Sequence, residues 1–303
     1  MSLVINNNMM AANTARTLNQ HYGRLAQSTQ RLSSGLRINS AADDAAGLAI
    51  RELQRADIAA LQQGARNAND AISLIQTADG ALGVIDEKLI RLKELAEQAA
   101  TGTYDSTQRL MIESEYQAMA SEITRIANAT DFNGVHLLNG NLSSNTHDGS
   151  GRSHVDGLTS TGKMKIHFGS SNSSMEDYYY ITIGNTTASA LGVGNQAAST
   201  AAAYTVSTQE AAQKALDGIN QAIISKDKIR AHLGAMQNRL ENTITNLNVQ
   251  AENLQAAESR ISDVDVATEM TEFVRNQILT QSAVAMLSQA NSLPQMAMQL
   301  IGG

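Results

Sequence analysis

The stretch LGAMQNRLENTITNLNVQAENLQAAESRI, residues 233–261, decides the fold of this chain, because an apolar residue returns at every seventh position. These positions are Leu233, Leu240, Leu247, Leu254 and Ile261, with Met236, Ile244 and Ala251 offset from them by three or four. A heptad pattern of this kind lets two long helices bury a shared apolar seam. It predicts one long helix over about residues 209–263.

A second heptad run covers about residues 45–101. Its seventh positions are Leu61, Ala68, Ile75, Leu82, Leu89 and Ala96. Neither run contains proline, and both are rich in Ala, Leu, Gln, Glu and Arg, which favour helix. Because the seam is rich in alanine, we expect the two long helices to approach each other closely.

The two ends of the chain each carry a further amphipathic helix with few charges. We predict these helices over about residues 3–35 and 266–290, with a Gly- and Ser-rich break after the first and Ser40 or Asp43 capping the next helix. Their apolar stripes include Leu18, Leu25, Leu32, Met270, Phe273, Ile278 and Leu287. A polar helix of the first kind is marginal alone, so we expect the two ends to pair. Such faces suit either a self-assembling rod or an ordinary coiled coil with frayed ends.

The middle of the chain has a different composition. A shorter helix over about 106–129, with Leu110, Tyr116 and Ile123 on its apolar positions, is expected to fold back on the first long helix. Residues 131–134 form a turn signal. Alternating residues at 163–168 and a β-rich run at 178–183 predict a β-hairpin, followed by loop with a short helix up to about residue 203.

These elements define a mainly α-helical fold, an elongated bundle of long antiparallel helices with paired termini and a small β-hairpin region. We expect a terminal helical core domain from residues 1–40 and 261–303. A helical rod domain takes residues 41–140 and 205–260. A variable region takes residues 141–204, with its hairpin at about 163–184.

Composition and motifs argue against an enzyme. Of 303 residues only 3% are aromatic and none is Cys, which excludes disulfides and thiolate metal sites. The net charge of -7 argues against a nucleic-acid partner. No histidine pair has the spacing of a helical metal site, so we expect no metal and no cofactor. His147 and His154 lie in a polar loop, and Asp43 and Asp44 begin a helix, where carboxylates are favourable.

Export is a separate question. No apolar run approaches the ~20 residues that span a bilayer, and the start of the chain lacks a secretory signal pattern. Ser and Thr residues between 141 and 176 form either an unmodified loop or a site of O-glycans; both readings stay open.

Several motifs resemble those of the bacterial flagellins. The most specific is RLSSGLRINSAADDAAGLAI at 31–50, and the C-terminal half is similar at 233–247, 259–265, 277–281 and 289–295. The resemblance covers about residues 1–139 and 208–303, and residues 163–169 and 178–184 resemble the small hairpin of the family's rod domain. The break between the halves is too short for a large outer domain, which implies a minimal flagellin.

This resemblance implies the structural subunit that polymerises into the flagellar filament for swimming. It implies a secreted, extracellular protein, exported unfolded through the flagellar secretion channel and assembled at the tip. The implied partners are further copies of the chain, the secretion apparatus, the filament cap, an export chaperone and hook–filament junction proteins. A junction protein or a coiled-coil adaptor remains the alternative.

The resemblance also implies recognition by the vertebrate Toll-like receptor for flagellin. Arg91, Leu95 and Glu115 match the family's receptor motif, while Ile90 departs from the polar residue common there. Arg91 and Leu95 are four apart, so they share one helical face, and we expect an exposed leucine beside the arginine. The same residues also suit contacts between subunits.

Overall fold

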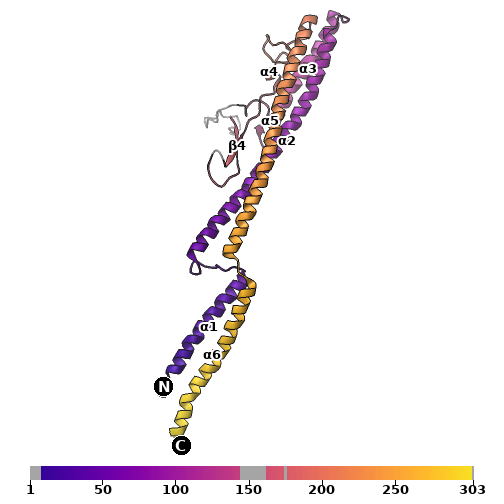
Figure 1. Cartoon of the computed structure of the whole chain (residues 1–303). Helices are drawn as coiled ribbons and strands as arrows, with labels where there is room; N and C mark the ends of the chain where they lie inside the picture. Colours follow the sequence, from indigo (N-terminus) through magenta and orange to yellow (C-terminus); the bar gives the residue numbers. More distant parts are fainter. Residues whose placement is uncertain (1–7, 144–161, 174–175, 302–303) are drawn as a thin grey trace. The chain divides into compact units, whose positions relative to one another are not determined.

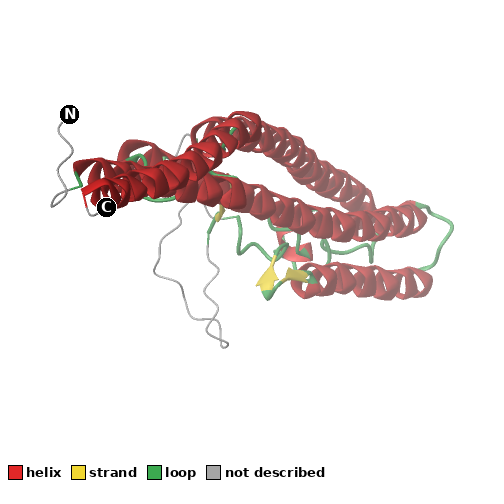
Figure 2. Cartoon of the chain, turned by 90° about the horizontal axis from the view of Figure 1, so that it is seen from below, coloured by secondary structure: helices red, strands yellow, loops and turns green. Residues whose placement is uncertain are grey.

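The computed structural model describes residues 8–143, 162–173 and 176–301, and the side chains of all of these except 293–295 and 297–301. Figures 1 and 2 show a mainly helical chain with its strands confined to the middle of the sequence, as predicted. The elements are α1 (Met9–Ser34), α2 (Ala45–Ala100), α3 (Ser106–Ala129), β1 (Asp131–Phe132), β2 (Val135–His136), β3 (Met164–His167), β4 (Tyr178–Ile181), α4 (Ala188–Leu191), α5 (Gln209–Ser262) and α6 (Val266–Ile301).

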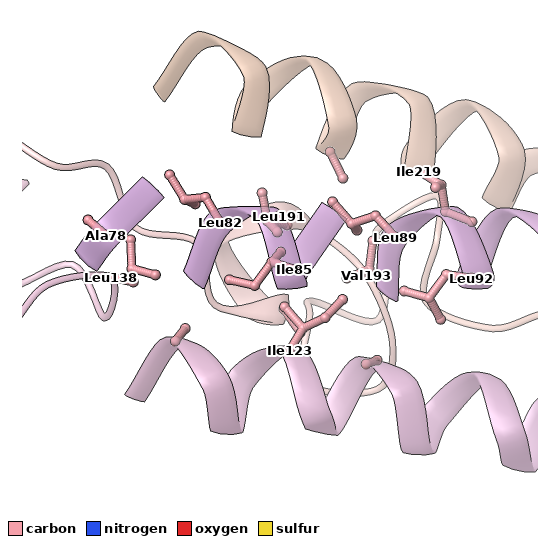
Figure 3. Close-up of a cluster of buried hydrophobic side chains, with 14 of the residues drawn as sticks. Ala78, Leu82, Ile85, Leu89, Leu92, Ile123, Leu138, Leu191, Val193 and Ile219 are labelled. Atoms are coloured by element: carbon pink, nitrogen blue, oxygen red, sulfur yellow. The ribbon is translucent and has the colours of Figure 1, made fainter. Parts of the chain in front are cut away.

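The chain divides into two compact units, which we name the terminal unit (Met1–Ile58 and Glu252–Gly303) and the central unit (Ala59–Ala251). In the central unit, the predicted heptad positions of α2 and α5 are buried. Leu82, Leu89 and Leu240 are 0% exposed. Side chains of α2, α3, α5 and the loops around α4 meet in one cluster, which includes Ile85, Ile123 and Ile219 (Figure 3). The shared seam of α2 and α5 is therefore confirmed, and α3 adds a third wall.

The buried face of helix α3 differs in part from the face that its apolar residues predicted. Its buried residues are Ile112, Tyr116, Ala120, Ile123 and Ala127, whereas Leu110 is 59% exposed. The Tyr116 hydroxyl donates to the carbonyl of Ala203 at 2.7 Å, and burial raises the pKa of this phenol far above its usual value. The prediction that Leu110 lies on the buried face was wrong, because Ile112 occupies the buried position in that turn.

In the terminal unit, α1 packs along α6, as predicted for the two ends (Figure 1). The residues 3–7 of the expected first helix lie outside the described residues. Helix α6 does not end at Ala290 as predicted but continues through Pro294 to Ile301. A proline has no N–H, so the carbonyl four residues earlier, that of Ala290, loses its helical partner. The Asn8 side-chain amide donates to this carbonyl at 2.8 Å and supplies the missing bond.

Asn8 also caps α1, because its side-chain oxygen accepts the N–H of Ala11 at 3.0 Å. Replacing Asn8 by alanine is expected to lower the free energy of unfolding by about 1–2 kcal/mol, since it removes a cap and leaves the Ala290 carbonyl without a donor. Urea unfolding of the disassembled chain, followed by circular dichroism, measures this loss. Asn8→Asp keeps the cap but not the donor, so we expect its free energy of unfolding to lie between those of the parent and Asn8→Ala. Equal stability of the parent and both variants would contradict the bridging role of Asn8.

The breaks at the two ends are hydrogen-bonded to each other. Gly35 ends α1 in the left-handed conformation, with φ at 71°, and its carbonyl accepts the N–H of Val264 at 3.0 Å. The N–H of Arg37 donates to the carbonyl of Ser262 and its guanidinium donates to that of Ile261, both at 2.6 Å. The two breaks therefore form one paired segment within the terminal unit.

The cap of α2 differs from the prediction. Asp44, rather than Ser40 or Asp43, accepts the N–H of Gly47 at 2.9 Å at the start of this helix. Asp43 instead accepts the N–H groups of Ser40 and Asn39, and these bonds lower the pKa of its carboxyl. Adjacent carboxylates look alike in sequence, and the turn before the helix decides which of them becomes the cap.

Two small hairpins complete the central unit. Strands β1 and β2 are joined at Asn133 and Gly134, which both have positive φ, as the turn signal predicted. Strands β3 and β4 pair antiparallel, with His167 opposite Tyr178 and Met164 opposite Ile181. The loop 184–203 contains the predicted short helix, α4.

Candidate interaction surfaces

The predicted apolar stripe divides between two faces of α6. Phe273 and Leu287 are half-buried, while Met270 is 45% and Ile278 is 57% exposed. The most buried residues of α6 are Asn276, Thr280, Ala283 and Ala290. On α1, Leu18, Leu25 and Leu32 are half-buried, and Ser28 is buried. The α1·α6 seam is thus made of small and polar side chains as well as leucines.

A second face of α6 has no neighbour among the described residues. Val266, Met270, Val274 and Ile278 are spaced four apart, so they lie on one side of the helix, and each is at least 43% exposed. Leu279, Val284 and Met286 extend this apolar surface. We call these seven residues the open face of α6. The predicted stripe included Met270 and Ile278 of this face but did not separate them from the residues that pack on α1, because a helix that is apolar on two sides shows no single stripe.

A hollow of about 500 Å³ lies beside this face, between α1 and α6. Its walls include Met10, His21, Leu279 and Met286. Met9, Met10 and Tyr22 add further exposed apolar surface on α1. Contiguous apolar surface of this kind marks an interaction site in soluble proteins.

Two of the three residues of the predicted receptor motif, Arg91 on α2 and Glu115 on α3, are brought together. The Arg91 guanidinium contacts the same Glu115 oxygen through Nε at 3.0 Å and Nη2 at 2.7 Å, and Nη1 contacts Glu94 at 2.9 Å. These carboxylates, Glu115 first, raise the pKa of the guanidinium. All three charged side chains are about half exposed, so the pairs are accessible to a partner.

Leu95 does not lie in the exposed position that was expected. It is 1% exposed and belongs to the buried cluster of the central unit. Four residues place two side chains on one side of a helix, but the 40° offset turns Leu95 toward the core and leaves Arg91 at the rim. Exposed apolar residues nearby are Ile90 on α2 and Leu110 and Met111 on α3.

Other kinds of site find no support in the described part of the chain. Within it, no group of three or more His, Asp or Glu side chains is arranged to hold a metal ion. Over the same residues, none of the helices combines the length and apolarity needed to cross a membrane. His147, His154 and most of the 141–176 loop, with its possible glycan positions, lie outside the described residues.

The fold and these surfaces define an α-helical structural protein whose terminal helices leave an apolar surface uncovered. Residues 5–143 match the model for the bacterial flagellin N-terminal helical region, and residues 216–301 match the flagellin C-terminal helical region. The chain therefore belongs to the bacterial flagellin family.

Relatives of full length agree with this assignment. Flagellin FlaB2 of Treponema pallidum (strain Nichols) is 40% identical over 299 residues, covering 99% of this chain and 100% of the relative. A flagellin of Bacillus subtilis (strain 168) is 41% identical over 313 residues, covering 98% of this chain and 99% of the relative. A structure assigned to a flagellar hook-associated protein of Vibrio parahaemolyticus has a TM-score of 0.53 at 12% identity, covering 73% of this chain and all of the other. That last likeness concerns the fold alone.

The chain is thus a subunit of the flagellar filament, a structural protein of bacterial motility that polymerises and is part of the flagellum. The family is not an enzymatic one, which agrees with the sequence. Its helical regions match without a large additional domain, as predicted for a minimal flagellin. The full-length relatives are flagellins and a filament core protein, which decides against the coiled-coil adaptor and the junction protein.

Proposed function

We propose that the open face of α6 and the hollow beside it form the contact by which subunits join in the filament. The observation that carries this proposal is the concentration of exposed apolar side chains on α6, where four of them repeat at the helical spacing. Burying such a surface against another copy supplies about 25 cal/mol per Å² of apolar area. Leu18, Leu25, Leu32, Phe273 and Leu287 then hold α1 on α6, and Met270 and Ile278 contact the neighbour.

Charge on the open face tests this assignment. The double variant Val274→Asp/Ile278→Asp is expected to abolish seeded polymerisation, because two carboxylates would be buried without partners. Gln250→Asp/Gln255→Asp adds the same charge at exposed polar positions of α5, outside the open face, and serves as the control. Negative-stain electron microscopy after heating, cooling and seeding gives the readout. Normal filaments from the first variant would exclude the open face as the subunit contact.

We also propose the domain roles and the export route that membership in the family suggests. Residues 1–40 and 261–303 form the filament core domain, residues 41–140 and 205–260 form the rod domain, and residues 141–204 are the variable region. The chain is exported unfolded through the flagellar secretion channel and adds at the tip under the cap. An export chaperone covers the apolar surface of α6 beforehand, and junction proteins connect the filament to the hook.

A further proposal concerns the charged cluster of α2 and α3. We propose that Arg91 and Glu115 contact the Toll-like receptor when the chain is monomeric and contact another subunit in the filament. Their support is the half-exposed ion pair at 2.7 Å and the flanking exposed Ile90. Leu95 contributes indirectly, since its buried side chain fixes α2 in the central unit.

Receptor signalling by the monomer tests this second proposal. Arg91→Ala is expected to reduce signalling in receptor-expressing reporter cells at least tenfold, in line with the loss of one interface hot spot. Arg125→Ala removes a comparable exposed guanidinium that pairs with Glu122 at 2.6 Å on α3, and it serves as the control. Equal signalling by both variants would rule out a receptor role for Arg91.

A further inference from the structure

The β3–β4 hairpin presents an outer face made of cations and aromatic side chains. Side chains alternate between the two faces of a strand, so Lys165 and His167 on β3 lie on the same side as Tyr178 and Tyr180 on β4. The contacts agree: the Lys165 ammonium is 3.7 Å from the Tyr178 ring centre, and the His167 ring stacks on Tyr178 at 6.1 Å. The opposite face is buried, with Phe168 3% and Ile181 0% exposed.

Helix α5 adjoins this face at Thr182, the residue after β4. A hollow of about 210 Å³ is lined by Thr182 and Gly184 of the hairpin segment and by Lys228, Ile229 and His232 of α5. Lys228 and His232 are four apart and both exposed, so they point to the same side of the helix. We call Lys163, Lys165, His167, Tyr178, Tyr180, Thr182, Lys228 and His232 the hairpin groove.

Charge is segregated at this groove. The chain as a whole carries 29 acidic and 22 basic residues, yet no carboxylate is among the residues of the hairpin groove. In the turn before β4, Asp177 is 8% exposed and accepts the N–H of Ser173 at 2.6 Å, while Glu176 is exposed and is the one carboxylate of this turn open to solvent. On α5, Asp227 pairs with Lys226 at 2.7 Å rather than with Lys228. Among the described residues, Lys163, Lys165 and Lys228 form no ion pair, and a local excess of such cations on an acidic protein attracts a polyanion.

The aromatic rings indicate which polyanion fits. Binding of single-stranded nucleic acid relies on ring faces on which bases stack. Here the face of Tyr178 is covered by the Lys165 ammonium, and that of Tyr179 by the Arg239 guanidinium at 3.6 Å. Tyr180 is the exposed ring of the run, at 40%. The hydroxyls of Tyr178 and Tyr180 are hydrogen-bonded to each other, and together with the ammonium groups and the Thr182 hydroxyl they suit a ligand rich in hydroxyls and negative charge.

We propose that the hairpin groove binds an anionic polysaccharide, with Lys163, Lys165 and Lys228 contacting its sulfate or carboxylate groups. The Thr182 and tyrosine hydroxyls contact the sugar hydroxyls. Charge-assisted hydrogen bonds give each lysine a measurable share of the affinity. The hairpin groove shares no residue with the open face of α6 or with the Arg91–Glu115 pair, so the proposal does not depend on the function proposed above.

The test uses the full, unpolymerised chain and measures binding to heparin, polygalacturonate and neutral dextran at low salt. The parent chain is expected to bind the anionic polymers and not dextran. Lys163→Gln/Lys228→Gln is expected to weaken that binding at least tenfold. Lys88→Gln/Lys93→Gln makes the same change in net charge on α2, outside the groove, and is expected to bind as the parent does. Circular dichroism confirms that both variants keep their helices.

The two anionic polymers distinguish the group recognised: binding of heparin alone identifies a sulfated glycan, and binding of both identifies anionic sugars in general. Three outcomes would overturn the proposal. One is an equal loss in both double variants, which indicates non-specific charge. Another is tighter binding of a single-stranded oligonucleotide that depends on the same lysines. The third is no polysaccharide binding but a change in self-association of the Lys163/Lys228 variant, which would make the groove a contact with a second copy.

Discussion

Replacing Asp86 by alanine is expected to lower the free energy of unfolding of the central unit by about 3 kcal/mol. Its Oδ1 lies 2.5 Å from the ammonium of Lys226, a lysine that is 1% exposed at a seam position of α5. Removing one partner of a buried ion pair costs about 3–5 kcal/mol, because the remaining charge stays buried. The lower end applies here, since Asp227 still contacts the ammonium at 2.7 Å.

Asp79→Ala is the matched control for this prediction. Asp79 contacts Arg230 at 2.7 Å between the same two helices, but both side chains are about 40% exposed. Exposed pairs contribute about 0–1 kcal/mol, so this variant should unfold within that range of the parent. Lys226→Met removes the buried charge and fills its volume, and it leaves the carboxylates of Asp86 and Asp227 in contact with water, at 29% and 59% exposed, so we expect stability equal to the parent or higher. Urea unfolding compares the three chains; equal losses for Asp86→Ala and Asp79→Ala would refute the argument from burial.

Gly64→Ala is expected to lower the free energy of unfolding by about 2 kcal/mol. A Cβ at position 64 would lie 1.9 Å from the carbonyl oxygen of Phe168 and 2.6 Å from its carbon, so α2 and the backbone after β3 cannot keep their present approach. Overpacking costs about 1–3 kcal/mol or more, while the better helix propensity of alanine returns up to about 1 kcal/mol. The hydrogen bond from Asn67 to the carbonyl of His167, at 2.8 Å, would be strained by the same movement.

The same helix supplies the control for this second prediction. Nothing lies within 4 Å of a Cβ built at Gly80 or Gly83, so Gly80→Ala and Gly83→Ala are expected to stabilise the chain by up to about 1 kcal/mol. The sign of the effect therefore separates a packing contact from helix propensity. Hydrogen exchange at the amides of β3 and β4 should rise only in Gly64→Ala. Stabilisation by Gly64→Ala would show that the hairpin moves away at no cost.

The long helices were predictable because their signal is repeated many times. Leu82, Leu89 and Leu240 are each one member of a heptad series, and an error at one position does not change the pattern. The hairpin was predictable from its alternation, and its register agrees with Lys165 and Tyr180 on one face. The sequence did not predict that α5 lies beside this face, because alternation within a strand does not specify which element packs against the hairpin.

The sites were less predictable than the helices, for physical reasons. The pairing of Arg91 with Glu115 depends on how far α2 and α3 are shifted along each other, and the spacing of residues within one helix does not determine this shift. The burial of Leu95 depends on α3 as a third wall of the core. The continuation of α6 through Pro294 depends on a donor 286 residues away in sequence, and no local pattern reveals it.

The contact between Asn8 and Ala290 also constrains the order in which the chain folds. It joins residues separated by 282 positions, and such distant contacts close slowly because the loop entropy is lost before they form. Helix α1 has Ser28 as its one buried residue, so it has little to hold it in place until α6 arrives. Folding of α1 therefore depends on synthesis of the whole chain: we expect a polypeptide that stops short of α6 to leave α1 without its partner helix, and only a chain that reaches α6 to form the ordered α1–α6 pair.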